Sequence, residues 1–440
     1  MSPSRIPIRP LPPAAPAPTT ADLGQAVDGR WRWSRVAAAP HRLGFLAGAL
    51  LLALTALWWM LALLDRHGGM ALPWAVAASL AHGLAMALSS MPLFIIGFLF
   101  TAGPRWLGLP DVPGSSLVRL VTLYAAGWVG ALAGFHLHAG LAAAGVAMAA
   151  LAWVQVLLRF GRLIRASRTS DKLHARAIAQ AGWVGAAALL VASAALALQQ
   201  GAWLRAATQV ALWAFVAPVF TIVAHRMLPF FTHSALPAVE AWRPDALLLW
   251  MRLALTVTGV AAAVEALGGP LPTAASVLLL AVQAPTAVLL LWLALRWGLV
   301  QSFSVKLLAM LHGGFVWLGV AMALAAAGQA VKLWFPDGPA LGLASLHALT
   351  VGFLGCTLVA MVTRVAAGHS GRAVVADRTA LALYGAVQLS AVSRLVVALW
   401  PQAPLGLTSF AAAAFAVAST GWLWRYGGWM GRPRADGRPG

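Results

Sequence analysis

Twelve apolar runs, each long enough to cross a bilayer, constrain the fold of this chain of 440 residues more than any other feature. They lie at about 43–64, 72–101, 116–136, 139–160, 177–198, 204–227, 246–268, 273–297, 307–329, 340–363, 378–400 and 404–425. A helix of about 20 apolar residues spans the hydrocarbon core of a membrane. The sequence therefore predicts an all-α, polytopic bundle of about twelve transmembrane spans embedded in a lipid bilayer.

The net charge of +19 follows this topology and does not indicate a nucleic-acid-binding surface. The basic residues lie in short loops between apolar runs, and no nucleic acid partner is expected. Of the 30 Lys and Arg residues, 26 fall in the two tails and the even-numbered loops. Arg66, Arg205 and Lys332 lie in odd-numbered loops, and Arg394 lies inside span eleven. Because cytoplasmic loops are enriched in Lys and Arg, both termini are predicted to be cytoplasmic.

The remaining segments divide the chain into three parts. Residues 1–40 are rich in Pro and Ala and are predicted to be a disordered cytoplasmic tail. Residues 41–426 form the membrane domain, and residues 427–440 form a basic cytoplasmic tail. Segment 161–176 is polar and basic and is interpreted as a loop helix on the membrane surface. Pro92, Pro218 and Pro285 predict kinks, since proline removes a backbone hydrogen bond.

Span ten carries a polar stripe. His347, Thr350, Thr357 and Arg364 follow one another at helical spacing, with Leu354 and Met361 filling the positions between them. A neighbouring line of small residues would let another helix approach closely, and it consists of Ser345, Gly352, Gly355 and Cys356. An ionisable group within a span is a functional-site hypothesis, and the alternative is a histidine hydrogen-bonded to a neighbouring helix.

The histidines suggest how a cofactor could be held. Cys356 is the only cysteine, which excludes an internal disulfide, covalent c-type haem and a cysteine-ligated cluster. His82 and His347 lie at similar depth on different spans, as a low-spin b-type haem, or a haem with one histidine and an open position, would need. Arg394 lies near that level and could bind propionates. Arg394 could instead reach the surface or pair with Glu265.

Copper offers a second interpretation of some of these residues. His82 and Met86 share a helix face and could bind copper, although a packing role for Met86 is the simpler interpretation. His136 and His138 have a suitable spacing only if their helix has already ended. His225, His233 and His369 could equally be loop anchors at helix ends.

Several motifs together resemble the NnrS family of bacterial membrane proteins. They are APHRLGFLAG (39–48), AHGLAM with IGFLFTAGPRWLG (81–108), HRMLPFFT (225–232), LLAMLHGGFVWLG (307–319) and SLHALTVGFLG with VTRVAAGHSGR (345–372). The resemblance covers nearly the whole membrane portion. It implies an inner-membrane protein associated with haem and copper, linked to denitrification, the nitric oxide response and tolerance of nitrosative stress.

The resemblance also assigns residues. The family's histidine and arginine positions fall on His82, His312, His347, Arg364, His369 and Arg394. Family members often have His-Ala-His-Glu-Met where this chain has His82-Gly-Leu-Ala-Met86, so that Leu84 and Ala85 replace a histidine and a glutamate. If that histidine is a ligand in the family, this chain has lost a metal site. If it only supports a ligand, its replacement weakens metal affinity without abolishing it.

The residues and this resemblance together favour a multi-pass protein of the bacterial inner membrane that binds haem and is also a candidate for binding copper. We expect it to act in nitric oxide metabolism or protection. In this hypothesis His82 and His347 ligate the haem, Thr350 orients a ligand or an imidazole, and Arg394 balances propionate charge. His82, Met86, His312, His347 and His369 are the candidate metal ligands. Nitric oxide and an electron donor or membrane oxidoreductase are the expected partners. The alternatives are a secondary transporter without cofactor and a sensor or assembly factor.

Overall fold

The computed structural model describes residues 29–69, 71–335, 341–400 and 402–438. Within these residues every regular element is a helix, and twelve helical stretches are long and apolar enough to cross a membrane. The predicted all-α fold and the predicted number of spans are therefore confirmed. Residues 1–28, which make up most of the predicted N-terminal tail, lie outside the described residues.

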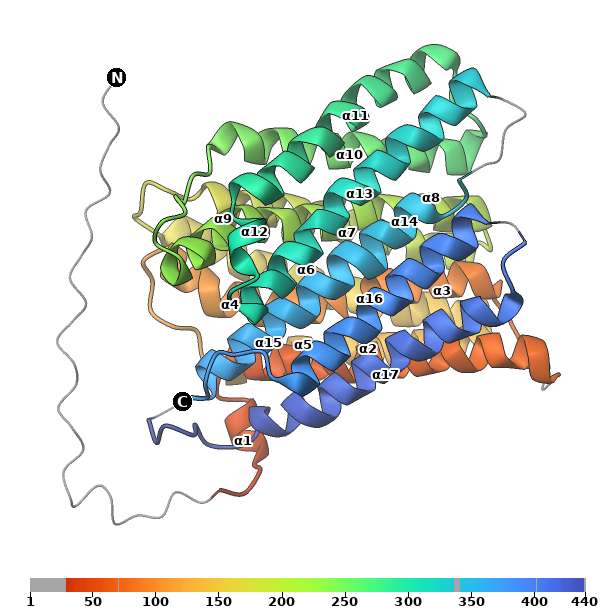
Figure 1. The fold of residues 1–440 in the computed structure, drawn as a ribbon. Helices are drawn as coiled ribbons and strands as arrows, with labels where there is room; N and C mark the ends of the chain where they lie inside the picture. The colour runs from red at the N-terminus through yellow and green to blue at the C-terminus, as the bar shows by residue number, and fades with distance from the viewer. Residues whose placement is uncertain (1–28, 70, 336–340, 401, 439–440) are drawn as a thin grey trace, which may run out of the picture.

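The spans follow one another as a bundle of roughly antiparallel helices (Figure 1). The first six comprise α2 (Pro40–Gly68), α3 (Ala78–Leu88) with α4 (Met91–Trp106), η2 (Gly114–Leu117) with α5 (Val118–Leu137), α6 (Ala139–Ala166), α7 (Leu173–Ala197), and α8 (Gly201–Val210) with η3 (Ala211–Val216) and α9 (Ala217–Ala235). The second six comprise α10 (Asp245–Gly268), α11 (Thr273–Arg296), α13 (Lys306–Trp334), α14 (Ala344–His347) with η4 (Ala348–Gly355) and α15 (Cys356–His369), α16 (Arg378–Leu399) and α17 (Leu405–Met430). Two short helices, α1 (Trp33–Val36) and α12 (Leu299–Ser302), lie outside the spans.

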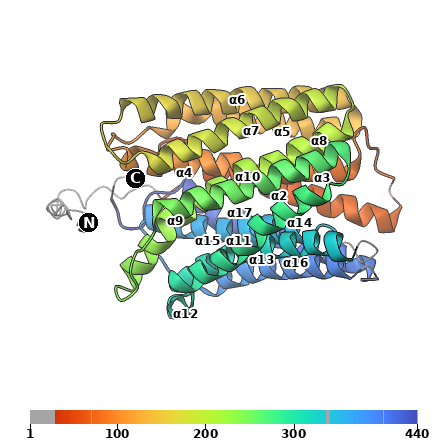
Figure 2. The ribbon, with the colours of Figure 1, turned by 90° about the horizontal axis from the view of Figure 1, so that it is seen from above.

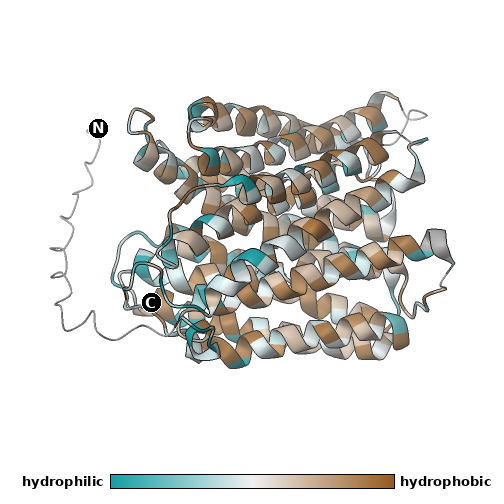
Figure 3. Cartoon of the chain, turned by 60° about the horizontal axis from the view of Figure 1, so that its bottom comes forward, coloured by the Kyte–Doolittle hydropathy of each residue, from teal (hydrophilic) through white to brown (hydrophobic). Residues whose placement is uncertain are grey.

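Both ends of the described chain meet at one end of the bundle, which we call the terminal end (Figure 1). The backbone N–H of Arg32 donates to the carbonyl of Gly431 at 2.8 Å. Residues 431–438, the C-terminal segment, then pair with the chain after α15, where the Ala435 N–H donates to the Ser370 carbonyl at 2.8 Å. Hydrophilic residues gather at the ends of the helices, and hydrophobic residues cover their lengths (Figure 3).

Three spans form the centre of the bundle. The most apolar stretches of spans two, six and ten are 83%, 78% and 83% buried, whereas that of span twelve is 28% buried. Seen from above, across the helices, α15 lies among the other helices while α6 and α16 lie at opposite faces (Figure 2). The central spans are therefore the ones whose side chains can line an internal site.

Glycines allow some of these helices to touch through their backbones. A Cβ atom added to Gly134 of α5 would lie 2.2 Å from the backbone nitrogen of Ala142 in α6. A Cβ atom added to Gly44 of α2 would lie 2.6 Å from the Cα atom of Gly97 in α4. Small residues permit such close approach, which maximises van der Waals contact between helices in lipid.

The central spans are also the irregular ones. Span two is interrupted at Ser89 and Ser90, just before Pro92 in the first turn of α4. Span six becomes a π-helix over η3, immediately before Pro218, and span ten becomes one over η4. Pro285 lies inside α11 without interrupting it. π-Helical turns are rare and occur frequently at functional sites, so spans six and ten are marked by their backbones as well as by their burial.

The interpretation of segment 161–176 as a surface loop helix is wrong. Helix α6 continues to Ala166 and α7 begins at Leu173, so only residues 167–172 connect the two spans. Arginines at 159, 162 and 165 therefore extend the last turns of a membrane helix. Long arginine side chains reach the membrane surface from such positions, which lets a span end in a basic sequence.

Candidate functional site

A cavity of about 650 Å³ lies at the terminal end, between α4, α9, α15 and the C-terminal segment. We call it the basic cavity. Its charged lining residues are Arg105, Arg364, His369 and Arg434, and its apolar walls include Phe98, Trp106, Met227, Phe230, Phe231 and Val365. Three segments far apart in the sequence thus bring three guanidinium groups and an imidazole to one cavity.

Helix ends position these groups. Arg105 lies in the last turn of α4, and Arg364 and His369 lie near the end of α15. The C-terminal segment contributes Arg434, whose guanidinium also donates to the His369 carbonyl at 3.4 Å. The chain after α15 turns at Gly371 with φ of +68°, where a Cβ atom would lie 2.5 Å from the Asp436 side chain. Glycine is therefore needed for the turn that lets the C-terminal segment close over this end.

The three arginines differ in how their charge is balanced. Arg105 lies 3.4 Å from the exposed carboxylate of Asp111. Arg434 makes two hydrogen bonds to Asp436, at 2.9 and 2.6 Å. Those hydrogen bonds lower the pKa of the Asp436 carboxyl to about 2, so this partner is ionised at neutral pH.

Arg364 is the unbalanced charge. Its guanidinium carbon lies 4.1 Å from the centroid of the Phe231 ring, and no acidic residue in the described part of the chain pairs with it. An aromatic face attracts a cation but does not neutralise its charge. The basic cavity therefore carries an excess of positive charge beside apolar walls, which suits an anionic group attached to an apolar body.

His369 lies against a second histidine. Its ring centroid is 4.2 Å from that of His41 in α2, and the planes are tilted by 40°. His41 is 6% exposed and its Nδ1 atom has no hydrogen-bond partner. Two imidazoles on opposite sides of one iron would place their centroids about 6 Å apart, given metal–nitrogen bonds of about 2 Å. His41 and His369 therefore cannot both ligate one haem iron in this arrangement, and only His369 lines the basic cavity.

A hydrogen-bonded histidine pair that the sequence did not reveal lies at the same end. His174 Nε2 and His225 Nδ1 are 3.1 Å apart. His225 Nε2 is 3.2 Å from the Pro244 carbonyl, and Arg226 donates to His174 Nδ1 at 3.3 Å. Because a carbonyl can only accept, His225 donates from Nε2 and accepts at Nδ1 from His174. Every ring nitrogen thus has a partner, and the pair anchors the loop before α10.

The other candidate histidines of this end make hydrogen bonds within the bundle. His312 of α13 is fully buried, and its Nε2 lies 3.0 Å from the Thr232 hydroxyl of α9. Thr232 already donates to the Leu228 carbonyl, so His312 donates to Thr232. His233 Nδ1 lies 2.9 Å from the Val239 carbonyl. The contact of His233 fits its interpretation as a loop anchor, whereas Nδ1 of His312 is buried without a hydrogen-bond partner.

The haem ligands expected from the sequence lie near the opposite end. The His82 ring stacks on Trp59 at 3.9 Å, and Met86 is half-buried on the same helix, α3. Leu84 and Ala85, which replace polar residues of the family motif, are both fully buried and pack in the core. This part of α3 therefore presents apolar packing where the family motif has a histidine and a glutamate.

His347 has the geometry of an oriented ligand. Its Nδ1 lies 3.0 Å from the Leu343 carbonyl, which leaves Nε2 for another partner. The charge of Arg394, on α16, acts on the His347 ring. Glu265 is paired with Lys332 at 2.5 Å instead of with Arg394, and Thr350 donates its hydroxyl proton to Leu346, 2.8 Å away. The structure thus brings His347 and Arg394 together, whereas Thr350 has no proton left to donate.

His136 and His138 lie where α5 ends. The helix stops at Leu137, as copper binding by this pair would require. Both ring nitrogens of His136 have partners, however, since Trp58 Nε1 and the Pro73 carbonyl each lie 2.7 Å away. His138 caps α6 by accepting from the Gly140 N–H at 3.0 Å. More generally, no group of three His, Cys, Asp or Glu residues within the described ranges could hold a metal ion.

The polar stripe of span ten is divided by η4. A π-helix forms i→i+5 hydrogen bonds, so residues three or four apart before and after it no longer share one face. His347 and Thr350 remain near the opposite end, whereas Arg364 lines the basic cavity. Thr357 and Met361 line a smaller cavity in between. The neighbouring line of small residues does allow close packing, since a Cβ atom on Gly352 would lie 2.6 Å from the Trp317 ring.

Comparison with known proteins decides the family. The model of the family described as NnrS protein matches residues 35–434. The chain belongs to the NnrS family. Membership supports a membrane protein of the nitric oxide response, in a family associated with haem and copper. No curated protein and no solved structure matches the chain.

Proposed function

We propose that this NnrS protein binds a non-covalent b-type haem in the basic cavity and acts in the nitric oxide response at the bacterial inner membrane. The observation that carries the proposal is the convergence of His369, an unbalanced Arg364 and aromatic walls on one cavity at the terminal end. The terminal end would be the cytoplasmic end, because the sequence concentrates Lys and Arg in the loops and tails that emerge there.

The residues present fit a haem. A volume of about 650 Å³ lies within the range of about 300–1,000 Å³ typical of ligand pockets. Phe98, Trp106 and Phe231 supply an apolar lining for a porphyrin. No described contact occupies the ring nitrogens of His369, so this side chain would be able to hold a haem through its iron. Histidine is a common protein ligand of haem iron, and arginines would be able to bind the haem propionates.

When bound, the haem would supply an iron that takes nitric oxide as a ligand. The chain's own residues would hold and orient it. Arg364 would offset propionate charge, assisted by Arg105 and Arg434, whose exposed acidic partners screen them only in part. The His41 ring, packed behind His369, restricts how far that imidazole can turn. Within the described part of the chain, no group of three His, Cys, Asp or Glu side chains could hold a copper ion.

A second haem position is favoured by one observation. The bond between His347 Nδ1 and the Leu343 carbonyl orients the imidazole as metal-ligating histidines usually are, and Arg394 lies near it. His82 would be the second ligand there, as the sequence suggested. The two positions lie toward opposite ends of the bundle, so single substitutions distinguish them.

The test is the haem content and the oxidised and reduced visible spectra of the purified full-length protein. His369→Ala is expected to lower haem content or change the axial-ligand bands, while His347→Ala and the matched control His233→Ala leave the spectrum unchanged. His233 is an exposed histidine of the same end that does not line the basic cavity.

The outcomes separate the hypotheses. A spectrum altered only by His347→Ala would place the haem near the opposite end and refute the assignment to the basic cavity. A folded wild-type protein that binds no haem would refute the haem proposal altogether. The transporter and the sensor or assembly-factor hypotheses would then take precedence, and neither needs a bound cofactor.

A further inference from the structure

A second cavity lies in the centre of the bundle, next to the basic cavity. Its volume is about 50 Å³, and we call it the central chamber. Five helices line it, namely α2, α4, α7, α9 and α15, through the side chains of Phe45, Phe94, Ile95, Phe98, Leu99, Ile178, Val219, Phe220, Val223, Thr357, Leu358, Met361 and Val362. All of these are hydrocarbon, aromatic or thioether groups except the hydroxyl of Thr357.

The irregular backbone frames this chamber. Helix α9 begins directly after the π-helical η3, and α15 begins directly after the π-helical η4. Side chains from the first turns of both helices, Val219 and Phe220 on one and Thr357 and Leu358 on the other, line the chamber. The Phe220 and Phe353 rings meet edge to face at 6.3 Å beside it. The two central π-helical segments thus converge on the chamber.

The chamber adjoins two other cavities, and single side chains line it together with each of them. Phe98 lines both the central chamber and the basic cavity. Toward the other side, Phe94, Leu358 and Val362 line both the chamber and a smaller cavity of about 20 Å³. That smaller cavity is bounded by α2, α4, η4, α15, α16 and α17. Three neighbouring cavities therefore lie in a row between the basic cavity and spans eleven and twelve, which are among the least buried spans.

Physical chemistry decides what such a chamber can hold. A buried water molecule needs about two to four polar partners, and empty protein cavities are apolar and take up xenon or benzene instead. The Thr357 hydroxyl is the single polar group in the lining, and it makes no hydrogen bond in the structure. One hydroxyl cannot replace the hydrogen bonds that water would lose. The volume of about 50 Å³ suits a diatomic molecule but not a larger metabolite.

We propose that the central chamber is a binding site for a small uncharged gas molecule, nitric oxide above all, which it passes between the lipid-facing spans and the basic cavity. The choice of nitric oxide rests on the proposed function, whereas the capacity for a small apolar gas rests on the chamber alone. Nitric oxide is uncharged and loses no strong hydration on entering such a space. The site holds it by dispersion contacts with its walls.

Xenon is the probe for this site, because it is apolar, of similar size and visible by anomalous X-ray scattering. Crystals of the full-length protein would be pressurised with xenon. A peak in the central chamber is expected for the wild type and should be lost in Val219→Phe, where a ring fills the space. Val288→Phe is the matched control. It is the same substitution at a position outside the chamber, on α11, where the valine is 69% exposed.

Leu358→Phe gives a second filling variant if Val219→Phe fails to fold, and Thr357→Val tests the hydroxyl. Xenon accepts no hydrogen bond, so Thr357→Val should keep the peak. The proposal is overturned if wild-type crystals show xenon elsewhere but none in the chamber, or if the peak persists when the chamber is filled.

A separate measurement tests the link to the basic cavity. In a haem-loaded protein, Val219→Phe should slow nitric oxide association with the reduced haem and leave the spectrum unchanged, while Val288→Phe does neither. An unchanged rate would refute the passage to the basic cavity. A colourless protein whose chamber still binds xenon would refute the haem proposal and leave the gas site standing, so the two failures are distinguishable.

Discussion

Gly314→Ala should displace the helix that carries the site, because α13 and α15 touch at this glycine. A Cβ atom on Gly314 would lie 2.5 Å from Thr357 Oγ1, 2.9 Å from its backbone nitrogen and 3.1 Å from its Cα atom. The hydroxyl could rotate away, but the two backbone atoms move only if α15 moves. Overpacking of this kind costs roughly 1–3 kcal/mol.

Gly328→Ala on the same helix is the matched control. No atom lies within 4 Å of a Cβ atom placed there. Both substitutions raise the free energy of unfolding by roughly 0.5–1 kcal/mol, because alanine loses less backbone entropy than glycine when a helix forms. This gain cancels between the two variants, so their difference in unfolding free energy should equal the crowding cost of about 1–3 kcal/mol, with Gly314→Ala the less stable.

The assay is the free energy of unfolding in mixed detergent micelles, followed by circular dichroism as the denaturing detergent is increased. Haem content of the same samples reports on the site, because α15 carries Arg364 and His369. We expect Gly314→Ala to lower both the free energy of unfolding and the haem content, and Gly328→Ala to lower neither of them. Equal stability of the two variants would refute the backbone contact between α13 and α15.

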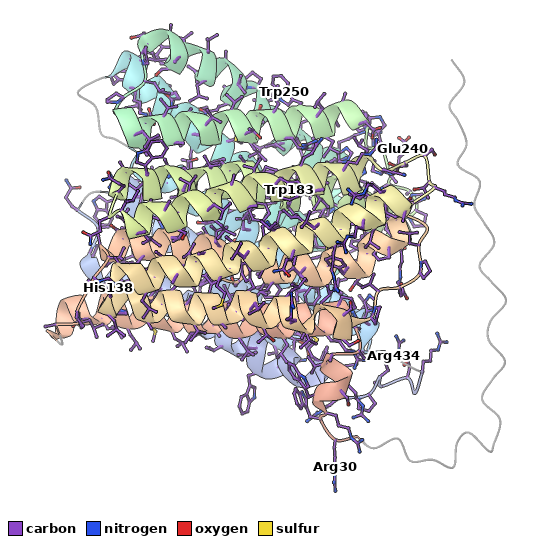
Figure 4. The ribbon with its side chains drawn as sticks, turned by 180° about the vertical axis from the view of Figure 1, so that it is seen from behind. Arg30, His138, Trp183, Glu240, Trp250 and Arg434 are labelled. Carbon is purple, nitrogen blue, oxygen red and sulfur yellow. The ribbon has the colours of Figure 1, made fainter. Side chains whose placement is uncertain are left out.

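Two further predictions concern the ends of the bundle. The pKa of Asp436 is lowered to about 2 from about 3.9 in an unfolded chain, so its contribution to docking of the C-terminal segment is present above about pH 4 and is lost as the pH falls through about 2. Hydrogen-exchange protection of the Ala435 amide should follow this loss, and protection independent of pH would contradict it. For topology, His138→Cys should react with an impermeant maleimide on intact cells and Glu240→Cys should not, since the two residues lie at opposite ends of the bundle (Figure 4). The native Cys356 is fully buried and should not react. The reverse pattern would invert the predicted orientation.

The spans were predictable because each is a continuous apolar run, and the bilayer sets the length of such a run. The irregularities were not. The π-helical stretch Ala348–Gly355 contains no proline, and its sequence reads as an ordinary apolar helix. Its conformation depends on packing against neighbours such as Trp317, which a single sequence does not specify. The division of the polar stripe after Thr350 follows from that conformation.

The candidate site was only partly predictable. Arg364 and His369 could be singled out by their place in a motif, but Arg105 and Arg434 could not. Their proximity is set by where α4 ends and by the pairing of the C-terminal segment with Ser370, contacts between segments far apart in the chain. Helical periodicity carries no information about such contacts, so the sequence directed attention to the histidines of the opposite end instead.

The most direct test of a haem in the basic cavity is chemical rescue of His369→Gly with imidazole. The small ligand can enter the space that the missing side chain leaves, at the wall of a cavity of about 650 Å³. We predict that the reduced spectrum of the variant loses the wild-type axial-ligand bands and regains them when imidazole is added. A His369→Gly spectrum identical to that of the wild type before imidazole is added would contradict the assignment of His369 as the haem ligand.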